Sequence, residues 1–174
     1  MSRHPELHEL LVASMHVACP MTVPVVVPRL ADMSDEDYRV ALGYKSDEDE
    51  GKYIERMTGI VTFYAAIVQV DSLPGMKNPV GIDVGWRWVA RTLNMRPRKV
   101  TPSVLLAFLS VAGHSLHKTY KKQFAKLLQF VASDYSARMP DGCEGAVARL
   151  RVFLDGVFKS RSVPIPEGRE LATS

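Results

Sequence analysis

The chain has 174 residues, of which 47% are hydrophobic and 24% are charged, and its formal net charge is +3. This composition is ordinary for a globular protein, and the length suffices for one domain with a sizeable core. The sequence also argues against a membrane-spanning protein, because no apolar run approaches the roughly 18 residues of a membrane span. It argues against a secreted protein, because the first residues, with His4 and Glu6, do not resemble a secretory signal.

Apolar spacing in the first 70 residues predicts three helices. The first begins near Pro5 and ends at Cys19-Pro20, and prolines then favour an extended connector over 21–30. Ser34 precedes three acids and predicts the N-cap of a short second helix that stops at Gly43. An acidic loop over 47–50 follows, and we expect its carboxylates to be solvated. The third helix is apolar on two faces, which predicts burial between neighbours; the faces carry Ile54, Met57, Val61, Tyr64 and Val68, and Ile60, Phe63 and Ile67.

The second half of the chain continues the helical pattern. A helix over about 82–95 is followed by one that starts at Thr101-Pro102, with Thr101 as the predicted N-cap. Gly113 and Ser115 mark the place where we expect this helix to bend or break. Two more helices follow, around 120–135 and 147–158, and no segment alternates as a strand would. The sequence therefore predicts an all-α fold of about six or seven helices, with one domain over 1–162 and an extended tail over 163–174.

Charge is divided unevenly along the chain. The first 83 residues carry 13 acids against 7 bases, whereas the tract from Val84 to Ser133 carries nine Lys or Arg residues and no acid. A basic surface beside an acidic one predicts an anionic partner, which could be a phosphate compound, a nucleic acid or an acidic protein face.

Candidate partner-binding residues lie in this basic tract. Trp86 falls on the main apolar stripe of its helix, so we expect it in the core. Trp88 lies about 200° further around the helix, and it either packs against a second neighbour or is presented to a partner. The lysines near position 120 form either a solvated helix face or a site for phosphate groups or an acidic partner. The candidates for partner contact are Arg87 (one turn before Arg91), Trp88, Lys118, Lys121 and Lys122.

The sequence contains no recognisable catalytic or metal-binding motif. P-loop, dinucleotide-binding, zinc-protease and nucleophile-elbow patterns are all absent. His4 and His8, like His114 and His117, stand one helical turn apart, but each pair lacks a third ligand nearby, so we expect no metal site. The two cysteines, one of them Cys19, are far apart and favour a reduced compartment, cytosol or nucleus, over a disulfide. The prediction is a protein that is not an enzyme.

Six ordered blocks of sequence resemble one known family. The most specific block runs from Gly81 to Asn94 and contains Gly-Trp-Arg-Trp. The other blocks are Cys19-Pro20 with Val23-Pro24, Glu36-Asp37-Tyr38 with Leu42-Gly43-Tyr44, Tyr64-Ala65-Ala66-Ile67, Phe108 to Gly113 followed by Tyr120, Gln123-Phe124 and Lys126-Leu127, and Val163-Pro164-Ile165-Pro166 with Gly168. In these blocks the chain is similar to the C-terminal domain of the Gle family of RNA-export mediators, which act at the cytoplasmic side of nuclear pores.

The resemblance implies a fold, a function and a set of partners. The fold is a HEAT-repeat-like, right-handed helical stack. The function is to bind a DEAD-box RNA helicase and stimulate its ATPase during mRNA export, with inositol hexakisphosphate as a tether between the two proteins. An FG-repeat nucleoporin and translation factors are further implied partners.

The chain departs from the family pattern in the first helix. The family carries basic residues just before Cys-Pro that hold inositol phosphates, whereas this chain has Val17 and Ala18 there. His16 is therefore the candidate phosphate-binding residue of this helix. The family's full proteins also extend well before this point, and the resemblance covers the later part of their C-terminal domain. Two alternatives stay open, which are direct binding of RNA phosphates by the basic tract and a purely structural nucleoporin-binding scaffold.

Overall fold

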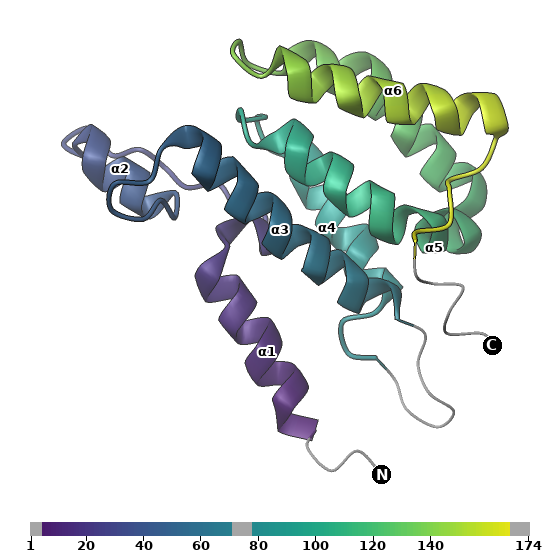
Figure 1. The fold of residues 1–174 in the computed structure, drawn as a ribbon, viewed down its shortest axis with the longest axis horizontal. Helices are drawn as coiled ribbons and strands as arrows, with labels where there is room; N and C mark the ends of the chain where they lie inside the picture. Colours follow the sequence, from purple (N-terminus) through teal and green to yellow (C-terminus); the bar gives the residue numbers. More distant parts are fainter. Residues whose placement is uncertain (1–4, 71–77, 168–174) are drawn as a thin grey trace.

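The computed structural model describes residues 5–70 and 78–167, and within these ranges the protein is helical with no strand. Figure 1 shows α3 and the first half of α5 side by side through the centre, with α6 along the second half of α5. The all-α prediction is confirmed. The helices are α1 (Pro5–Ala18), α2 (Asp35–Ala41), α3 (Glu50–Gln69), α4 (Ile82–Asn94), α5 (Thr101–Phe130) and α6 (Glu144–Ser160), with short turns η1 (Pro20–Thr22), η2 (Val131–Tyr135) and η3 (Ser136–Arg138).

The core lies where α3, α4 and α5 meet. The predicted inner face of α3 is buried, and Met57 and Val61 are fully covered. Its second predicted face is only partly covered, because Phe63 remains 51% exposed. α4 approaches α3 closely at Gly85, where an added Cβ would lie 2.6 Å from Val68 Cγ1. A side chain at this position would push the two helices apart, so the Gly-Trp-Arg-Trp block begins with a packing requirement.

Of the two tryptophans of α4, Trp88 packs in the core, which was one of its two open alternatives, and Trp86 packs at the edge of the core. Trp88 is 2% exposed, stacks on Phe108 with ring centroids 4.0 Å apart, and donates its indole N–H to the Met21 carbonyl at 2.8 Å. Trp86 is half-buried and tilts against Tyr120, with centroids 4.4 Å apart. The prediction that Trp88 contacts a partner does not fit this position, because its ring and its N–H are both used inside the core.

A partly buried ion pair joins the N-terminal elements. Arg56 donates from Nε and Nη2 to the two carboxylate oxygens of Glu48, at 2.7 and 2.6 Å, and the Glu48 side chain is only 8% exposed. The same guanidinium donates to the carbonyls of Ala18 at 3.0 Å and of Gly43 at 2.8 Å. The expectation that the acidic loop is solvated is therefore wrong for Glu48, because Arg56 covers and binds this carboxylate. The other contacts of Arg56 connect α3 to the ends of α1 and α2.

α5 starts and bends differently from the sequence prediction. Val100, not Thr101, is the N-cap, and the Thr101 hydroxyl accepts a hydrogen bond from the Arg98 N–H at 2.8 Å. The helix continues past Gly113 and is interrupted at Lys121, whose φ of 46° and ψ of −117° are not helical. This conformation is unfavourable for a residue with a side chain, so the lysine-rich part of α5 holds a strained backbone.

We expect Lys121→Gly to stabilise the protein. Glycine adopts positive φ without steric cost, and relief of such strain contributes about 1 kcal/mol or more to the free energy of unfolding. Lys122→Gly is the matched control, since a helical position loses about 1 kcal/mol on the same change. Urea denaturation measures both variants. If Lys121→Gly were destabilised as much as Lys122→Gly, the bend would not lie at residue 121.

The start of the predicted tail packs against α5. Val163 is 1% exposed, and its Cγ1 lies 3.1 Å from where a Cβ on Gly113 would stand. The His114 ring nitrogen Nδ1 lies 3.0 Å from the Val163 carbonyl oxygen, at hydrogen-bonding distance. Gly113 therefore serves to admit Val163 rather than to bend the helix. Gly168, the last residue of the matching blocks, lies outside the described residues.

Candidate functional site

Two arginines and a histidine from distant parts of the chain line one small pocket. It has a volume of about 160 Å³ and lies between α1, η1, α3 and α4. His16 comes from the last turn of α1, and Arg87 and Arg91 come from α4. The remaining lining residues are Thr22, Val23, Pro24, Tyr64, Val84 and Trp88. We call this pocket, with its two guanidinium groups and the imidazole of His16, the cationic pocket.

η1 fixes the orientation of His16. The Thr22 hydroxyl donates to the Cys19 carbonyl at 2.7 Å, so its oxygen is left to accept from His16 Nδ1 at 2.8 Å. His16 Nε2 then carries a proton, and can donate it to an anion, only when the ring is charged. Burial lowers the pKa of His16 from its ordinary value of 6.5, so the ring is mainly neutral at pH 7 and gains its charge at lower pH.

The two arginines stand one helical turn apart and present their guanidinium groups beside Tyr64. Burial raises the pKa of Tyr64, and the positive charges of Arg87 and Arg91 oppose this rise. Arg87 also forms an exposed ion pair with Asp83 at 3.3 Å. Arg91 forms no ion pair with any residue that the structure describes. One arginine is therefore shared with a surface carboxylate and the other is available to an anion.

The chemistry of the cationic pocket suits phosphate oxygens. Guanidinium groups only donate hydrogen bonds, and their planar fork matches the geometry of a phosphate group. Hydrogen bonds from such groups to anions are shorter and about twice as strong as neutral ones. The pocket is small enough to take one phosphate group while the rest of a larger ligand stays outside, where a second protein could reach it.

The predicted lysine site is separate from the cationic pocket. His117, Lys118, Lys121, Lys122 and Ala125 line a shallow depression on α5, and the two sites share no lining residue. All three lysines are exposed, and none forms an ion pair within the described part of the chain. The structure thus unites His16 with Arg87 and leaves the lysines as a second basic area.

Sequence reasoning missed Arg91 as a site residue. The available signal was its spacing of four residues from Arg87, which places both on one helix face. The family's basic positions are filled here by Val17, which is 87% exposed, and by Ala18, whose carbonyl accepts from Arg56. Cations on the neighbouring helix α4 therefore face the end of α1 in this chain.

No group of three His, Cys, Asp or Glu side chains within 5–70 and 78–167 could hold a metal ion. The His4 and His8 side chains lie outside the described part. Within the described ranges, no helix is long and apolar enough to cross a membrane.

Comparison with known proteins points to one family. A family model described as "GLE1-like protein" matches residues 1–132. The chain is 36% identical over 177 residues to the mRNA export factor GLE1 of Mus musculus. This alignment covers 95% of this chain and 25% of the mouse protein. It is 30% identical over 180 residues to the mRNA export factor GLE1 of Arabidopsis thaliana, covering 99% and 26%. The chain thus spans about a quarter of the length of the curated relatives it matches.

Two solved structures share the fold. One contains a leucine-to-valine variant of the Saccharomyces cerevisiae Dbp5 C-terminal domain bound to Gle1 and IP6; it aligns with a TM-score of 0.78 and 24% identity, covering 92% of this chain and 57% of that chain. The other contains the same Dbp5 domain with a histidine-to-arginine variant of Gle1 and IP6; it aligns with a TM-score of 0.77 and 26% identity, covering 92% and 58%. The helical stack of this chain is therefore the fold found in those complexes.

Proposed function

The chain belongs to the GLE1-like family, and from this premise we propose that it is the part of an mRNA export factor that binds and stimulates a DEAD-box helicase of the Dbp5 type. Inositol hexakisphosphate is the proposed tether between the two proteins. The observation that carries this proposal is the cationic pocket, in which His16, Arg87 and Arg91 meet on a fold shared with Gle1 bound to Dbp5 and IP6.

The proposed mechanism needs no catalytic group in this chain. One phosphate of the ligand enters the cationic pocket, and the outward phosphates pair with basic groups of the helicase. A rigid helical stack that binds the open arrangement of the helicase lobes better than the closed one shifts the population towards the open state. Product release, and with it the ATPase cycle, then becomes faster.

Further contacts with the helicase are proposed for the basic area on α5. Lys118, Lys121 and Lys122 are exposed and lack ion-pair partners among the described residues, so they are free to meet acidic groups of the helicase surface. The proposed place of action is the cytoplasmic side of the nuclear pore, with an FG-repeat nucleoporin and translation factors as further partners. The proposed domain is 1–162, with 163–174 as its tail.

The ATPase rate of the helicase tests this function. We expect the chain to stimulate RNA-dependent ATP hydrolysis when inositol hexakisphosphate is present and to have little effect without it. Stimulation of equal size in both conditions would contradict the tether. Absence of stimulation in both conditions would contradict the activator function itself.

The ligand should bind more tightly at lower pH. Because burial lowers the pKa of His16, its charged form is scarce at pH 7 and becomes populated as the pH falls through this lowered pKa. We expect affinity for inositol hexakisphosphate to rise as the pH falls below 6.5, the ordinary value of a histidine pKa. The phosphates also titrate, so His16→Gln is the comparison: its affinity should change less over this range. Identical pH profiles for the two proteins would remove His16 from the site.

RNA is a second candidate ligand, favoured by the three exposed lysines of α5. Binding to RNA phosphates releases counterions, so affinity for a single-stranded RNA should fall steeply as salt rises. Fluorescence anisotropy with a labelled RNA at several salt concentrations measures this slope. Lys121→Glu with Lys122→Glu should make the slope shallower, whereas a slope that is flat in the unmodified chain would exclude this candidate.

A further inference from the structure

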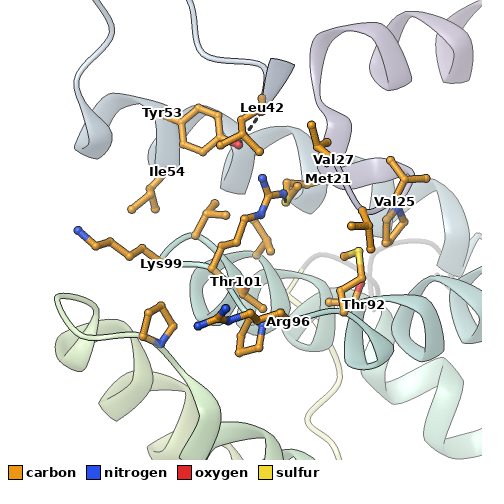
Figure 2. A pocket seen from close by; sticks show the side chains of 18 of the residues that line it. Met21, Val25, Val27, Leu42, Tyr53, Ile54, Thr92, Arg96, Lys99 and Thr101 are labelled. Atoms are coloured by element: carbon orange, nitrogen blue, oxygen red, sulfur yellow. Dashed lines mark hydrogen bonds between the residues drawn. The ribbon is translucent and has the colours of Figure 1, made fainter. Parts of the chain in front are cut away.

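A large cavity lies between the connector that precedes α2, the start of α3 and the loop that follows α4. It has a volume of about 540 Å³ and is bounded by the connector over 23–30, α2, the start of α3 and the loop over 95–100 (Figure 2). Aliphatic and aromatic side chains form most of its wall, including Val25, Val27, Leu42, Tyr53 and Ile54. This volume falls in the range of about 300–1,000 Å³ that is typical of ligand pockets.

Cations line one side of this apolar cavity. Arg96 is exposed and forms no ion pair with a described residue. The Arg98 guanidinium is half-buried, and its Nη2 lies 3.2 Å from the Met21 sulfur rather than against a carboxylate. Burial raises the pKa of Tyr53 to about 12, and the positive charge of Arg98 opposes this rise. The charge of Arg98 is therefore felt at the wall of the cavity. Only Lys99 is neutralised, by Glu50 at 3.1 Å.

The connector offers an unused backbone edge on another side of the cavity. Val25, Val26 and Val27 belong to no helix or turn, and none of their backbone groups takes part in a hydrogen bond within the described residues. Val25 is 50% exposed and Val26 is 75% exposed. Pro24 and Pro28 flank this run and limit the edge to three N–H groups. An exposed valine run with free N–H and C=O groups, made of residues that favour β-strands, can pair with another strand.

We propose that this cavity docks an extended peptide segment of a partner protein, which carries apolar side chains and at least one carboxylate. The main chain of the peptide pairs with Val25–Val27, its apolar side chains enter the cavity, and its carboxylate binds Arg96 and Arg98. The free backbone edge favours a peptide over an apolar small molecule with an acidic group, since only a peptide supplies matching donors and acceptors along its length. The proposal does not depend on helicase stimulation or on inositol phosphate.

Selection from a random peptide library displayed on phage tests this proposal, with the unmodified chain as target and Arg96→Glu as counter-target. We expect enriched peptides with Asp or Glu beside apolar residues. Synthetic, fluorescein-labelled versions should bind Arg96→Glu about tenfold more weakly, because a charge-assisted contact becomes repulsive. Arg151→Glu, an exposed change on α6, is the matched control and should not alter binding.

A second pair of variants tests the backbone edge. Val26→Pro removes one N–H in a segment that belongs to no helix, and Val26→Ala keeps this N–H. We expect Val26→Pro to weaken peptide binding more than Val26→Ala does, with thermal unfolding of both variants verifying the fold. Failure to enrich any peptide over the counter-target would overturn the proposal. So would equal binding by Val26→Pro and Val26→Ala together with displacement of the peptide by dodecanoate, because this result identifies an apolar acid as the occupant.

Discussion

Replacing Arg87 and Arg91 together by glutamate should abolish measurable binding of inositol hexakisphosphate. Both guanidinium groups line the cationic pocket. No carboxylate among the described residues forms an ion pair with Arg91 and so competes with the ligand for it. Hydrogen bonds between charged groups contribute about 1.5–3 kcal/mol each, so losing two lowers the affinity by about 100-fold or more. Isothermal titration calorimetry of the ligand into the chain measures the loss.

Two further variants separate a local effect from a general effect of charge. Arg149→Glu with Arg151→Glu makes the same change in net charge on exposed positions of α6, away from the pocket, and should leave affinity within about twofold. Asp83→Asn releases Arg87 from its surface ion pair and should strengthen binding slightly, since exposed pairs contribute less than about 1 kcal/mol. An equal loss in the α6 variant would contradict a site at Arg87 and Arg91.

Arg56→Ala should destabilise the fold strongly. It removes two hydrogen bonds to Glu48 and one each to the carbonyls of Ala18 and Gly43. Each such hydrogen bond contributes about 0.5–3 kcal/mol, the charged ones most, so we expect the free energy of unfolding to fall by about 2 kcal/mol or more. Urea denaturation monitored by circular dichroism measures this loss. A change below about 1 kcal/mol would mean that Glu48 is solvated after all.

The same ion pair makes stability depend on acidity. The hydrogen bonds from Arg56, the largest cause, lower the pKa of Glu48 from 4.5 to about 2. A carboxyl with a depressed pKa in the folded state stabilises the fold above its unfolded value, and this contribution is lost as the pH falls from about 4.5 to about 2. The free-energy difference between the unmodified chain and Glu48→Gln should therefore be full at pH 7 and shrink across this window. A difference that stayed constant below pH 4.5 would contradict the assignment.

Local signals in the sequence predicted the elements well because helix ends are set by nearby residues. Ser34 accepts a hydrogen bond from the Asp37 N–H at 3.1 Å and caps α2, and α1 ends just before Cys19-Pro20. The bend in α5 was misplaced for a physical reason. Gly113 is needed because Val163 packs closely against it. The break falls at Lys121, and lysine has no preference for this backbone conformation that the sequence could show.

Long-range packing explains what the sequence could not predict. Periodicity placed Trp86 and Trp88 on two different stripes of α4. It did not reveal that Phe108 and the Met21 carbonyl contact Trp88 on the second stripe. The cationic pocket joins residue 16 to residues 87 and 91, and only the packing of α1 near α4 brings them together. The family resemblance suggested a phosphate site at the end of α1, and His16 lies there, but the arginines come from another helix.

Complex formation between this chain and the helicase is the most direct test that the cationic pocket holds the tether. Sedimentation velocity measures it with and without inositol hexakisphosphate. We expect a one-to-one complex that forms with the ligand, weakens without it, and is lost in the Arg87→Glu, Arg91→Glu double variant. A complex that persisted equally in the double variant and in the absence of the ligand would contradict the central claim that the cationic pocket holds the tether.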